Sequence, residues 1–428
     1  MKRFFYSVAT ILVATLCLNT NVFAQNIIEK DYIFSFGNSH KDTALIRVLY
    51  ENAPKYFNAP DMPRFTIIGK QRAFYLGIGG FVKGTLSYDL GNPIQSPIYF
   101  EPSSIPMTKV AGNNSLVQFS AATSNLFFNF VGMPHSKNQI GAYINFNFSG
   151  TANTYGFSLR GAYLTYRNFL VGYNSSLFTD GAACTPTIDQ QGPNAMTFVF
   201  NTVINYQYSF NNHYKFGVGL EMPSVNATYG SVNYAVNQSI PDIPFYLQYN
   251  WKNAQGWIRL SGLWRNMYYR DVKKDENIDA MGWAVKLSGG VPLCSKATMF
   301  FQGVYGYGIG SYIQDMQGLG LDVVPDYKDA GKMKPVEAFG VYGGIQTQLC
   351  KKILTSATYS FVRSYLPESY INPPSSTYKS ATYIVANMFY SITPTVTTGI
   401  EYLWGYRKNI NNNFKQDTRL QMALRVNF

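Results

Sequence analysis

The sequence has few of the side chains on which most catalytic and metal sites depend. It contains three histidines, His40, His135 and His213, and four cysteines in 428 residues. His135 and His213 fall in short predicted turns and His40 precedes the first predicted strand, whereas nucleophilic catalysis needs a base within hydrogen-bond reach of the nucleophile. No Cys/His spacing is typical of a zinc site. The sequence therefore predicts no enzyme, no metal site and no cofactor.

The cysteine content also gives little support for disulfide bonds. Three cysteines, Cys184, Cys294 and Cys350, follow the first 24 residues, and an odd number in an oxidising compartment argues against a disulfide framework. Cys294 and Cys350 lie at neighbouring predicted turns. A single disulfide between them stays open as the alternative to free thiols.

Long hydrophobic runs are missing after residue 24. No later stretch approaches the roughly 20 apolar residues that a transmembrane helix requires. The first 24 residues themselves resemble a secretory signal peptide, because Lys2 and Arg3 precede an apolar stretch and Val22-Phe23-Ala24 is a suitable cleavage site. We expect residues 1–24 to be removed on export.

Charged residues make up only 14% of the chain, while 34 tyrosines and 31 phenylalanines accompany a mean hydropathy near zero. A membrane β-barrel has this composition, because a lipid-facing and a wet face cancel on average. The formal charge of +12 is more naturally explained by an electropositive lumen than by nucleic acid, and we expect no nucleic-acid partner.

The last residues show the alternation most clearly. Leu420, Met422, Leu424 and Val426 alternate with polar or small residues, and the chain ends on Phe428. Strict alternation predicts a strand with one apolar and one polar face. A terminal strand ending on an aromatic residue is typical of the signal read by the barrel-assembly machinery. The sequence thus predicts an all-β transmembrane antiparallel barrel in the cell outer membrane, in contact with its lipid.

Sixteen alternating segments follow from Phe74 onward. We expect strands at 74–90, 115–133, 140–152, 156–167, 169–180, 195–210, 213–223, 243–252, 256–271, 282–293, 297–310, 338–349, 353–365, 381–392, 395–408 and 418–428. Short and long connections largely alternate between them, as periplasmic turns and external loops do. The barrel therefore spans 74–428, and residues 25–73 form a periplasmic N-terminal extension or a segment that contacts the lumen.

The same alternation assigns side chains to the lumen. A charge facing lipid costs about 2–4 kcal/mol at mid-depth, so charged strand residues should point inward. The predicted inward residues are the basic Lys83, Arg160, Arg259, Arg265, Lys286, Arg407, Arg419 and Arg425 and the acidic Asp89, Glu221 and Glu401. A basic lining would select anions. The alternative is that these arginines pair with loop carboxylates and hold loops in place.

Two local features refine this expectation. Closing the barrel brings the first and last strands together, which would set Lys83 beside Arg419 and Arg425 as a cationic ladder. Loop 181–194, the third external loop, is expected to fold inward and narrow the pore, with Asp180 and Asp189 as its constriction carboxylates; an ordinary external loop is the alternative.

Three sequence blocks resemble the DcaP-like family of outer-membrane porins. They are Gly79-Gly80-Phe81-Val82-Lys83 with Tyr88-Asp89, the stretch from Phe157 to Tyr173, and Thr187-Ile188-Asp189 with Gln191-Gly192-Pro193-Asn194. The resemblance covers roughly residues 64–225. It implies a trimeric sixteen-stranded channel for small, often negatively charged solutes. Residues 25–73 lack the heptads that an N-terminal coiled coil of some members would need.

These observations together predict a porin that passes small hydrophilic solutes by diffusion, favours anions and forms a homotrimer. The alternative is a plugged or non-conducting barrel that acts as an adhesin or an assembly partner, with loop 311–337 as its binding or plugging segment.

Overall fold

The computed structural model describes residues 32–36, 43–60, 62–108, 112, 114–150, 155–251, 255–371 and 373–428. The expected signal peptide, residues 1–24, lies outside the described residues. Residues 151–154, which include most of the connection between the predicted strands 140–152 and 156–167, also lie outside them. Among the described residues, no helix is long and apolar enough to span a membrane.

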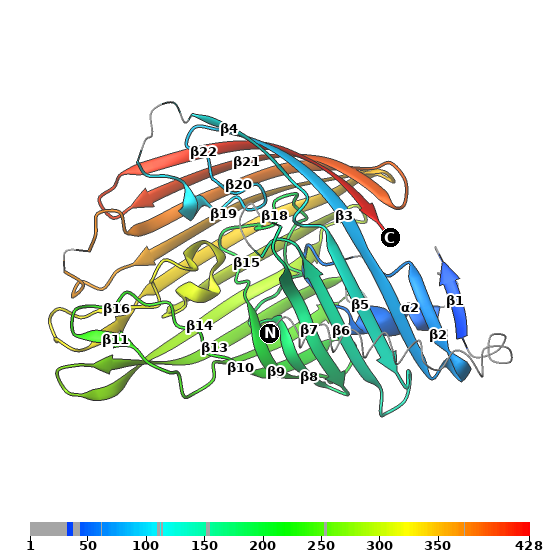
Figure 1. Ribbon diagram of the computed structural model, residues 1–428, viewed down its shortest axis with the longest axis horizontal. Coiled ribbons are helices and arrows are strands. Elements are labelled where there is room, and N and C mark those ends of the chain that lie inside the picture. The colour runs from blue at the N-terminus through cyan, green and yellow to red at the C-terminus, as the bar shows by residue number, and fades with distance from the viewer. Residues whose placement is uncertain are drawn as a thin grey trace, which may run out of the picture.

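The described chain forms a closed antiparallel barrel of sixteen strands, which confirms the predicted fold (Figure 1). One of them is split into two pieces, β4 (Ser115–Ser120) and β5 (Asn125–Gly132), which pair with successive parts of β3. The other fifteen are β3 (Phe74–Leu90), β6 (Ile140–Asn147), β7 (Ser158–Tyr166), β8 (Phe169–Ser175), β9 (Phe200–Ser209), β10 (Tyr214–Glu221), β12 (Ile243–Trp251), β13 (Gly256–Asp271), β14 (Glu276–Pro292), β15 (Ala297–Tyr307), β18 (Glu337–Cys350), β19 (Ile353–Tyr365), β20 (Tyr378–Ser391), β21 (Val396–Asn409) and β22 (Phe414–Asn427).

The barrel closes between its first and last strands. β22 pairs with β3 from Thr418↔Leu90 to Asn427↔Phe81. Beyond this ladder, Phe428 and Gly80 exchange both backbone hydrogen bonds at 3.0 Å. The C-terminal residue therefore completes the seam.

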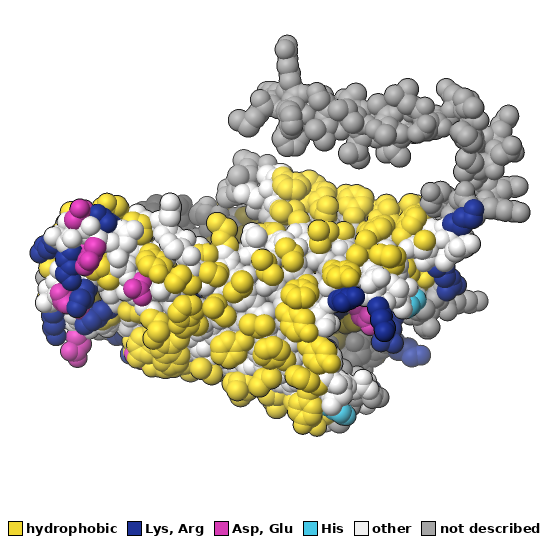
Figure 2. Space-filling view, turned by 90° about the horizontal axis from the view of Figure 1, so that it is seen from below, with side chains coloured by type: hydrophobic (Ala, Val, Ile, Leu, Met, Phe, Trp, Pro, Cys, Tyr) yellow, Lys and Arg dark blue, Asp and Glu magenta, His cyan; other side chains and the backbone are white. Residues whose placement is uncertain are grey.

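Inward and outward faces follow the alternation in the sequence. On β22, Leu420 and Met422 are 51% and 52% exposed, whereas the intervening Gln421 is 3% exposed. Figure 2 shows the result on one face of the molecule: an apolar band with charged side chains gathered toward its ends. This is the surface that a strand barrel presents to a bilayer.

Several connections differ from their predicted bounds, and two of them show the physical reason. β8 ends at Ser175 and β9 begins at Phe200, so the third external connection runs over 176–199 and is longer than the predicted 181–194. Conversely, β14 begins at Glu276, and its hairpin with β13 leaves only residues 272–275 as a turn. Alternation marks a strand only where one face meets lipid, so a polar hairpin beyond the membrane escapes a pattern-based boundary.

Several long loops of the barrel contain short strands or 3₁₀ turns. The loop between β10 and β12 carries β11 (Asn233–Ala235), which pairs with β13. The loop between β15 and β18 carries two 3₁₀ turns, η3 (Gly310–Tyr312) and η4 (Gln314–Met316), and a small hairpin of β16 (Val323–Pro325) and β17 (Met333–Pro335). A further turn, η2 (Pro102–Ser104), lies in the loop after β3.

The described residues before the barrel form a strand pair, one α-helix and a short 3₁₀ turn, η1 (Lys70–Arg72). β1 (Tyr32–Phe36) pairs with β2 (Phe65–Gly69), and β2 pairs with β3 beyond the end of β22, from Phe65↔Ile78 to Ile68↔Tyr75. Between them, α2 (Thr43–Asn52) leads into an irregular stretch. We call residues 43–60 the lumen insert, because Asn52 hydrogen-bonds to side chains of the barrel wall that point inward.

Candidate pore constriction and lumen lining

The connection over residues 176–199, called the constriction loop below, crosses the lumen to the opposite wall. Glu401 on β21 accepts hydrogen bonds from the backbone N–H groups of Ile188 (2.8 Å) and Asp189 (2.9 Å). Farther along the loop, the Ala195 N–H donates to Ser360 Oγ on β19 at 3.0 Å. A loop that starts at β8 and is fixed on β19 and β21 must narrow the channel.

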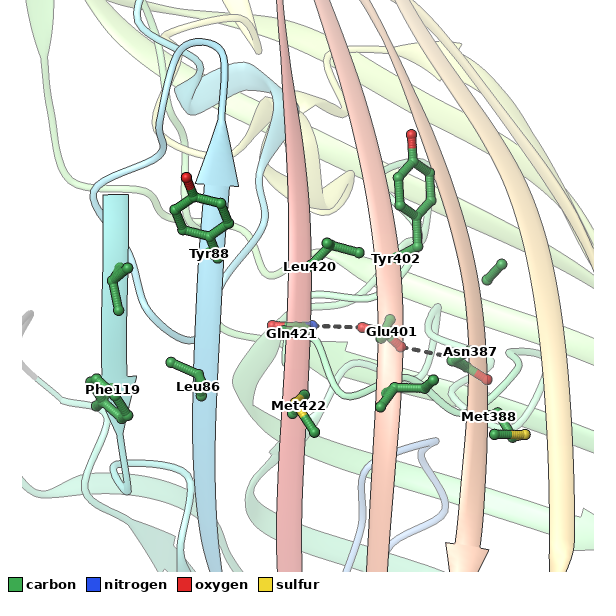
Figure 3. Close-up of a pocket in the computed structure, with 13 residues that line it drawn as sticks. Leu86, Tyr88, Phe119, Asn387, Met388, Glu401, Tyr402, Leu420, Gln421 and Met422 are labelled. Atoms are coloured by element: carbon green, nitrogen blue, oxygen red, sulfur yellow. Dashed lines mark hydrogen bonds between the residues drawn. The ribbon is translucent and has the colours of Figure 1, made fainter. Parts of the chain in front are cut away.

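Glu401 is itself held in place by its neighbours. Asn387 Nδ2 donates to it at 2.9 Å and Gln421 Nε2 at 2.6 Å. Figure 3 shows this chain of amide and carboxylate groups across β20, β21 and β22. Leu420, Met422 and Tyr402 on the same strands are exposed on the barrel's outer face. The inward polar row therefore forms a preorganised anchor for the constriction loop.

Asp189 joins the constriction loop to the loop over residues 91–114. It accepts hydrogen bonds from the Phe100 N–H at 2.9 Å, the Gly192 N–H at 3.1 Å and the Tyr383 hydroxyl at 3.0 Å. Burial, reinforced by the nearby Glu401 carboxylate, raises the pKa of Asp189 to about 7. The carboxyl group serves as a structural node between two loops.

Asp180 occupies the other end of the constriction loop. It accepts hydrogen bonds from Trp257 Nε1 at 3.0 Å and Ser288 Oγ at 2.7 Å, and Arg259 approaches to 3.9 Å. Asp180 thus ties the loop to β13 and β14. Asp180 and Asp189 both lie in the inward loop, and both are buried.

The loop between β15 and β18, residues 308–336, also enters the lumen. Asp315 accepts hydrogen bonds from the Ser103 N–H at 2.9 Å and from the Tyr378 hydroxyl at 2.6 Å. Its own N–H donates to the Asn194 carbonyl at 3.2 Å. Three loops are therefore joined on the long-loop side of the barrel.

Three of the predicted inward cations are fully buried and bonded. Arg265 contacts Asp242 at 3.0 Å and Asp322 at 3.4 Å. Lys286 donates to the Phe178 carbonyl, and to Thr197 Oγ1 at 3.1 Å. Arg419 forms a two-pronged ion pair with Asp89, which lies directly opposite on β3. These contacts satisfy the three charges within the protein.

Lys83 and Arg407 also contact loops. Lys83 Nζ donates to the Ile188 carbonyl at 2.7 Å, and Arg407 donates to the Ser103 carbonyl. Glu221, at the end of β10, accepts the Leu177 N–H at 2.7 Å. Each of these three groups therefore contacts the backbone of a loop, whereas pairing of an inward arginine with loop carboxylates is seen for Arg265 with Asp242 and Asp322.

The seam register changes the expected cationic ladder. Arg425 lies opposite Lys83, but Arg419 lies opposite Asp89 and pairs with it. The guanidinium of Arg425 also rests 3.9 Å from the centroid of the Phe81 ring. The ladder is therefore reduced to Lys83 and Arg425, because Asp89 neutralises the third member.

Arg160 and Arg259 are packed on aromatic rings. Arg160 lies 4.3 Å from the Phe200 ring centroid, and Arg259 lies 4.2 Å from that of Tyr246. The side chain of Arg259 stays 17% exposed and faces a cavity of about 650 Å³. This cavity lies between the constriction loop and the short turns, and α2 forms one of its sides.

Four further cations line this cavity: Arg47 and Lys55 of the lumen insert, Arg167 at a short turn and Lys215 of β10. Lys55 and Lys215 are the two that matter for the charge of the passage, because Arg47 pairs with Glu51 and Arg167 contacts the backbone and side chain of the neighbouring turn. Both were missed from the sequence. Lys215 has the same strand parity as Glu221, so the alternation that assigned Glu221 inward would also have found it. Lys55 stands in a segment without strand periodicity and carried no such signal.

The three cysteines that follow residue 24 are all free thiols. Cys184 is a buried free thiol in the constriction loop, and Cys294 and Cys350 are exposed free thiols. Within the described ranges, no group of three His, Cys, Asp or Glu side chains is arranged to hold a metal ion.

Fold and loop geometry together define an outer-membrane channel barrel with an inward third loop. Residues 136–425 match the porin subfamily, and the chain belongs to this family. No curated protein matches the chain. Its family and fold place it in the outer membrane and are those of a channel rather than an enzyme.

Solved structures agree on the fold. The outer-membrane channel DcaP of Acinetobacter baumannii superposes with a TM-score of 0.72 at 18% identity, over 84% of this chain and 99% of that one. OmpT of Vibrio cholerae gives 0.53 at 9% identity over 83% and 98%. The anion-selective porin of Comamonas acidovorans gives 0.52 at 10% identity over 83% and 100%. Together with the family match, the superposition on DcaP confirms the resemblance to a DcaP-like porin.

Proposed function

We propose that this porin passes small hydrophilic solutes by diffusion and favours anions. The observation that carries the proposal is the cavity between the constriction loop and the short turns. Arg259 and Lys215 of the barrel wall line this cavity together with Lys55 of the lumen insert. A narrow, low-dielectric passage focuses the field of such charges and raises the local concentration of counter-ions. Selection is electrostatic and involves no covalent step.

Both acidic groups of this cavity are bonded within the protein. Glu51 pairs at 2.8 Å with Arg47, which lies one turn earlier in α2 and also lines the cavity. Asp180 is occupied by Trp257 and Ser288. The remaining balance favours anions, which supports the proposed selectivity.

We also propose a homotrimer, the assembly implied by the family resemblance, inserted through the assembly machinery that reads the C-terminal strand. Crosslinking of the protein in its native membrane tests the first point, since a three-subunit ladder is expected and a monomer band alone would contradict it.

The channel itself is tested by the reversal potential of the purified protein in a planar bilayer under a KCl gradient. Discrete conductance steps with a chloride-favouring potential are expected. Steps with a potassium preference would retain the porin and refute the anion preference. Folded protein without conductance would favour the second candidate, a plugged barrel used for adhesion or assembly, for which the filled lumen is the supporting observation.

A further inference from the structure

The lumen insert is bonded to the inside of the barrel wall along its helix. Asn129 Nδ2 on β5 donates to the Leu49 carbonyl at 2.8 Å, and Asn52 Nδ2 returns a hydrogen bond to Asn129 Oδ1 at 2.7 Å. On β7, the Tyr163 hydroxyl donates to the Asn52 carbonyl at 2.7 Å and Thr165 Oγ1 donates to Asn52 Oδ1 at 2.7 Å. Four hydrogen bonds between matched groups of α2 and the wall indicate that the helix has one specific position.

An apolar contact surface accompanies these hydrogen bonds. Leu45, Val48 and Leu49 of α2 pack in one buried cluster with Tyr75 of β3 and Val131 of β5. Burial of such side chains stabilises a contact in proportion to the apolar area removed from water. The helix is therefore held by packing as well as by polar groups.

Beyond the helix, the insert reaches the constriction loop. The Tyr56 hydroxyl accepts a hydrogen bond from Asn145 Nδ2 on β6 at 3.1 Å, and its ring meets the edge of Phe198 with centroids 5.7 Å apart. Asn58 Nδ2 donates to the Gln190 carbonyl at 3.3 Å. The insert thus connects the short-turn end of the barrel to the constriction.

Glycines stand where the insert approaches most closely. A Cβ atom on Gly181 would lie 2.6 Å from Tyr56 Cβ, closer than real Cβ atoms approach a neighbour. A Cβ on Gly141 of β6 would collide with Asn52 Oδ1 and Thr165 Oγ1. Glycine within a strand often marks the close approach of another segment. The wall is therefore shaped to receive the insert.

The space left beside the insert is the 650 Å³ cavity. Its lining extends from Gln139 and Asn168 at the short turns to Gly181 in the constriction loop. Lys55 borders it from the insert, opposite Lys215 and Arg259 of the wall. A solute that passes the constriction meets this cavity before it reaches the short-turn end.

We propose that residues 43–60 are a resident insert that narrows the periplasmic half of the pore, and that Lys55 is a selectivity-determining residue of the passage left beside it. The wall alone would form a wider lumen there. The insert narrows this lumen and adds one positive charge to the route. This inference rests on the proposed channel function.

Two matched pairs of full-length variants test the proposal in planar bilayers. Gly141→Val displaces Asn52 from its seat, and Gly343→Val adds the same side chain at a lipid-facing position with no neighbour within 4 Å. Gly141→Val should raise single-channel conductance by roughly a factor of two, since a wider lumen carries more ions. Gly343→Val should leave it unchanged.

The second pair tests the charge. Lys55→Glu should shift the reversal potential toward potassium, whereas Lys351→Glu, at an exposed turn outside the cavity lining, should not. If Gly141→Val does not fold, Lys55→Cys in a Cys294→Ser/Cys350→Ser background replaces it, and an anionic thiol reagent should then reduce the current.

The outcomes separate the two proposals. Absence of conductance from folded wild-type protein would refute the channel function. A second outcome is wild-type conductance that Gly141→Val leaves unchanged, together with a reversal potential that Lys55→Glu does not shift. This outcome would refute the proposed role of the lumen insert and would retain the channel function. If the substitute variant is used, a current that the thiol reagent leaves unchanged would likewise refute the proposed role of the insert.

Discussion

Arg259 and Arg265 stand on the same inward face of β13 and have different surroundings. Arg259 retains a solvent-exposed part and borders the cavity, whereas Arg265 is fully buried between Asp242 and Asp322. A buried charge with buried partners contributes little to the field that a solute meets, but its removal leaves those partners uncompensated. The two arginines should therefore respond differently to substitution.

Replacing Arg265 with Gln should destabilise the folded barrel by about 3–5 kcal/mol, the range for removing one partner of a buried ion pair. Denaturant unfolding of the detergent-solubilised protein measures this loss. Unchanged stability together with a shifted reversal potential would instead place Arg265 on the solute route.

Replacing Arg259 with Gln should lower the anion preference and should destabilise the barrel less than Arg265→Gln does, because Arg259 approaches Asp180 only to 3.9 Å and keeps part of its side chain in contact with solvent. The reversal potential under a KCl gradient measures the effect. A Lys296→Gln variant, altered at an exposed turn, is the control and should behave as wild type.

Sequence reasoning could assign both arginines inward, because alternation fixes the face of a strand residue. It could not separate the exposed one from the buried one. The carboxylates that enclose Arg265 come from Asp242 and Asp322, which lie outside the transmembrane strands, and no periodic pattern predicts where a loop side chain will settle.

At the scale of elements, the constriction loop is held by groups from several strands. Glu401 and Tyr383 reach it from β21 and β20, and Lys83 reaches it from β3. Its inward fold was predicted from its place as the third external loop. Its true extent, 176–199, was not predicted, because residues that are buried on both sides lose the alternation that marks a strand end.

The protonation of Asp189 should make this loop pH-sensitive. Its pKa of about 7 in the folded protein lies above the ordinary value near 4, so the folded state holds the proton more tightly. The resulting stability is fully present below about pH 4 and is lost as the pH rises through 7. Glu401 opposes ionisation, while Arg419 favours it.

We therefore expect the wild-type barrel to lose thermal stability between pH 5 and pH 8, and the Asp189→Asn variant to lose less, because its amide does not titrate. The temperature at which the folded band disappears on a semi-native gel measures this. Equal losses in both proteins would show that Asp189 does not control the effect.

At the scale of the whole molecule, the sixteen strands of the barrel followed from the sequence. Repeated alternation and an even strand number leave little freedom in the arrangement of a barrel. For residues 25–73 the sequence left a periplasmic extension and a lumen-contacting segment as two alternatives, and it could not choose between them. The position of the lumen insert depends on matched single residues, such as Asn52 against Asn129 and Tyr56 against Gly181, which no composition or period reveals.

The C-terminal residue offers a test of assembly apart from stability. Replacing Phe428 with Ala keeps the two backbone hydrogen bonds to Gly80 and removes only the ring. If the ring is read by the assembly machinery, the amount of folded barrel in the outer membrane of a Gram-negative host should fall several-fold, while the purified variant should refold in detergent as wild type does.

Leu424→Ala is the matched control, since Leu424 lies on the same lipid-facing side of β22 and is equally exposed. It should reach the membrane at the wild-type level. Both variants lose a lipid-facing apolar side chain of the same strand. If the amount of folded barrel in the membrane falls in both, the cause is the loss of apolar surface. A defect in Phe428→Ala alone, with normal refolding in detergent, would locate the signal in the terminal ring, because the seam bonds that close the barrel are the same in both variants.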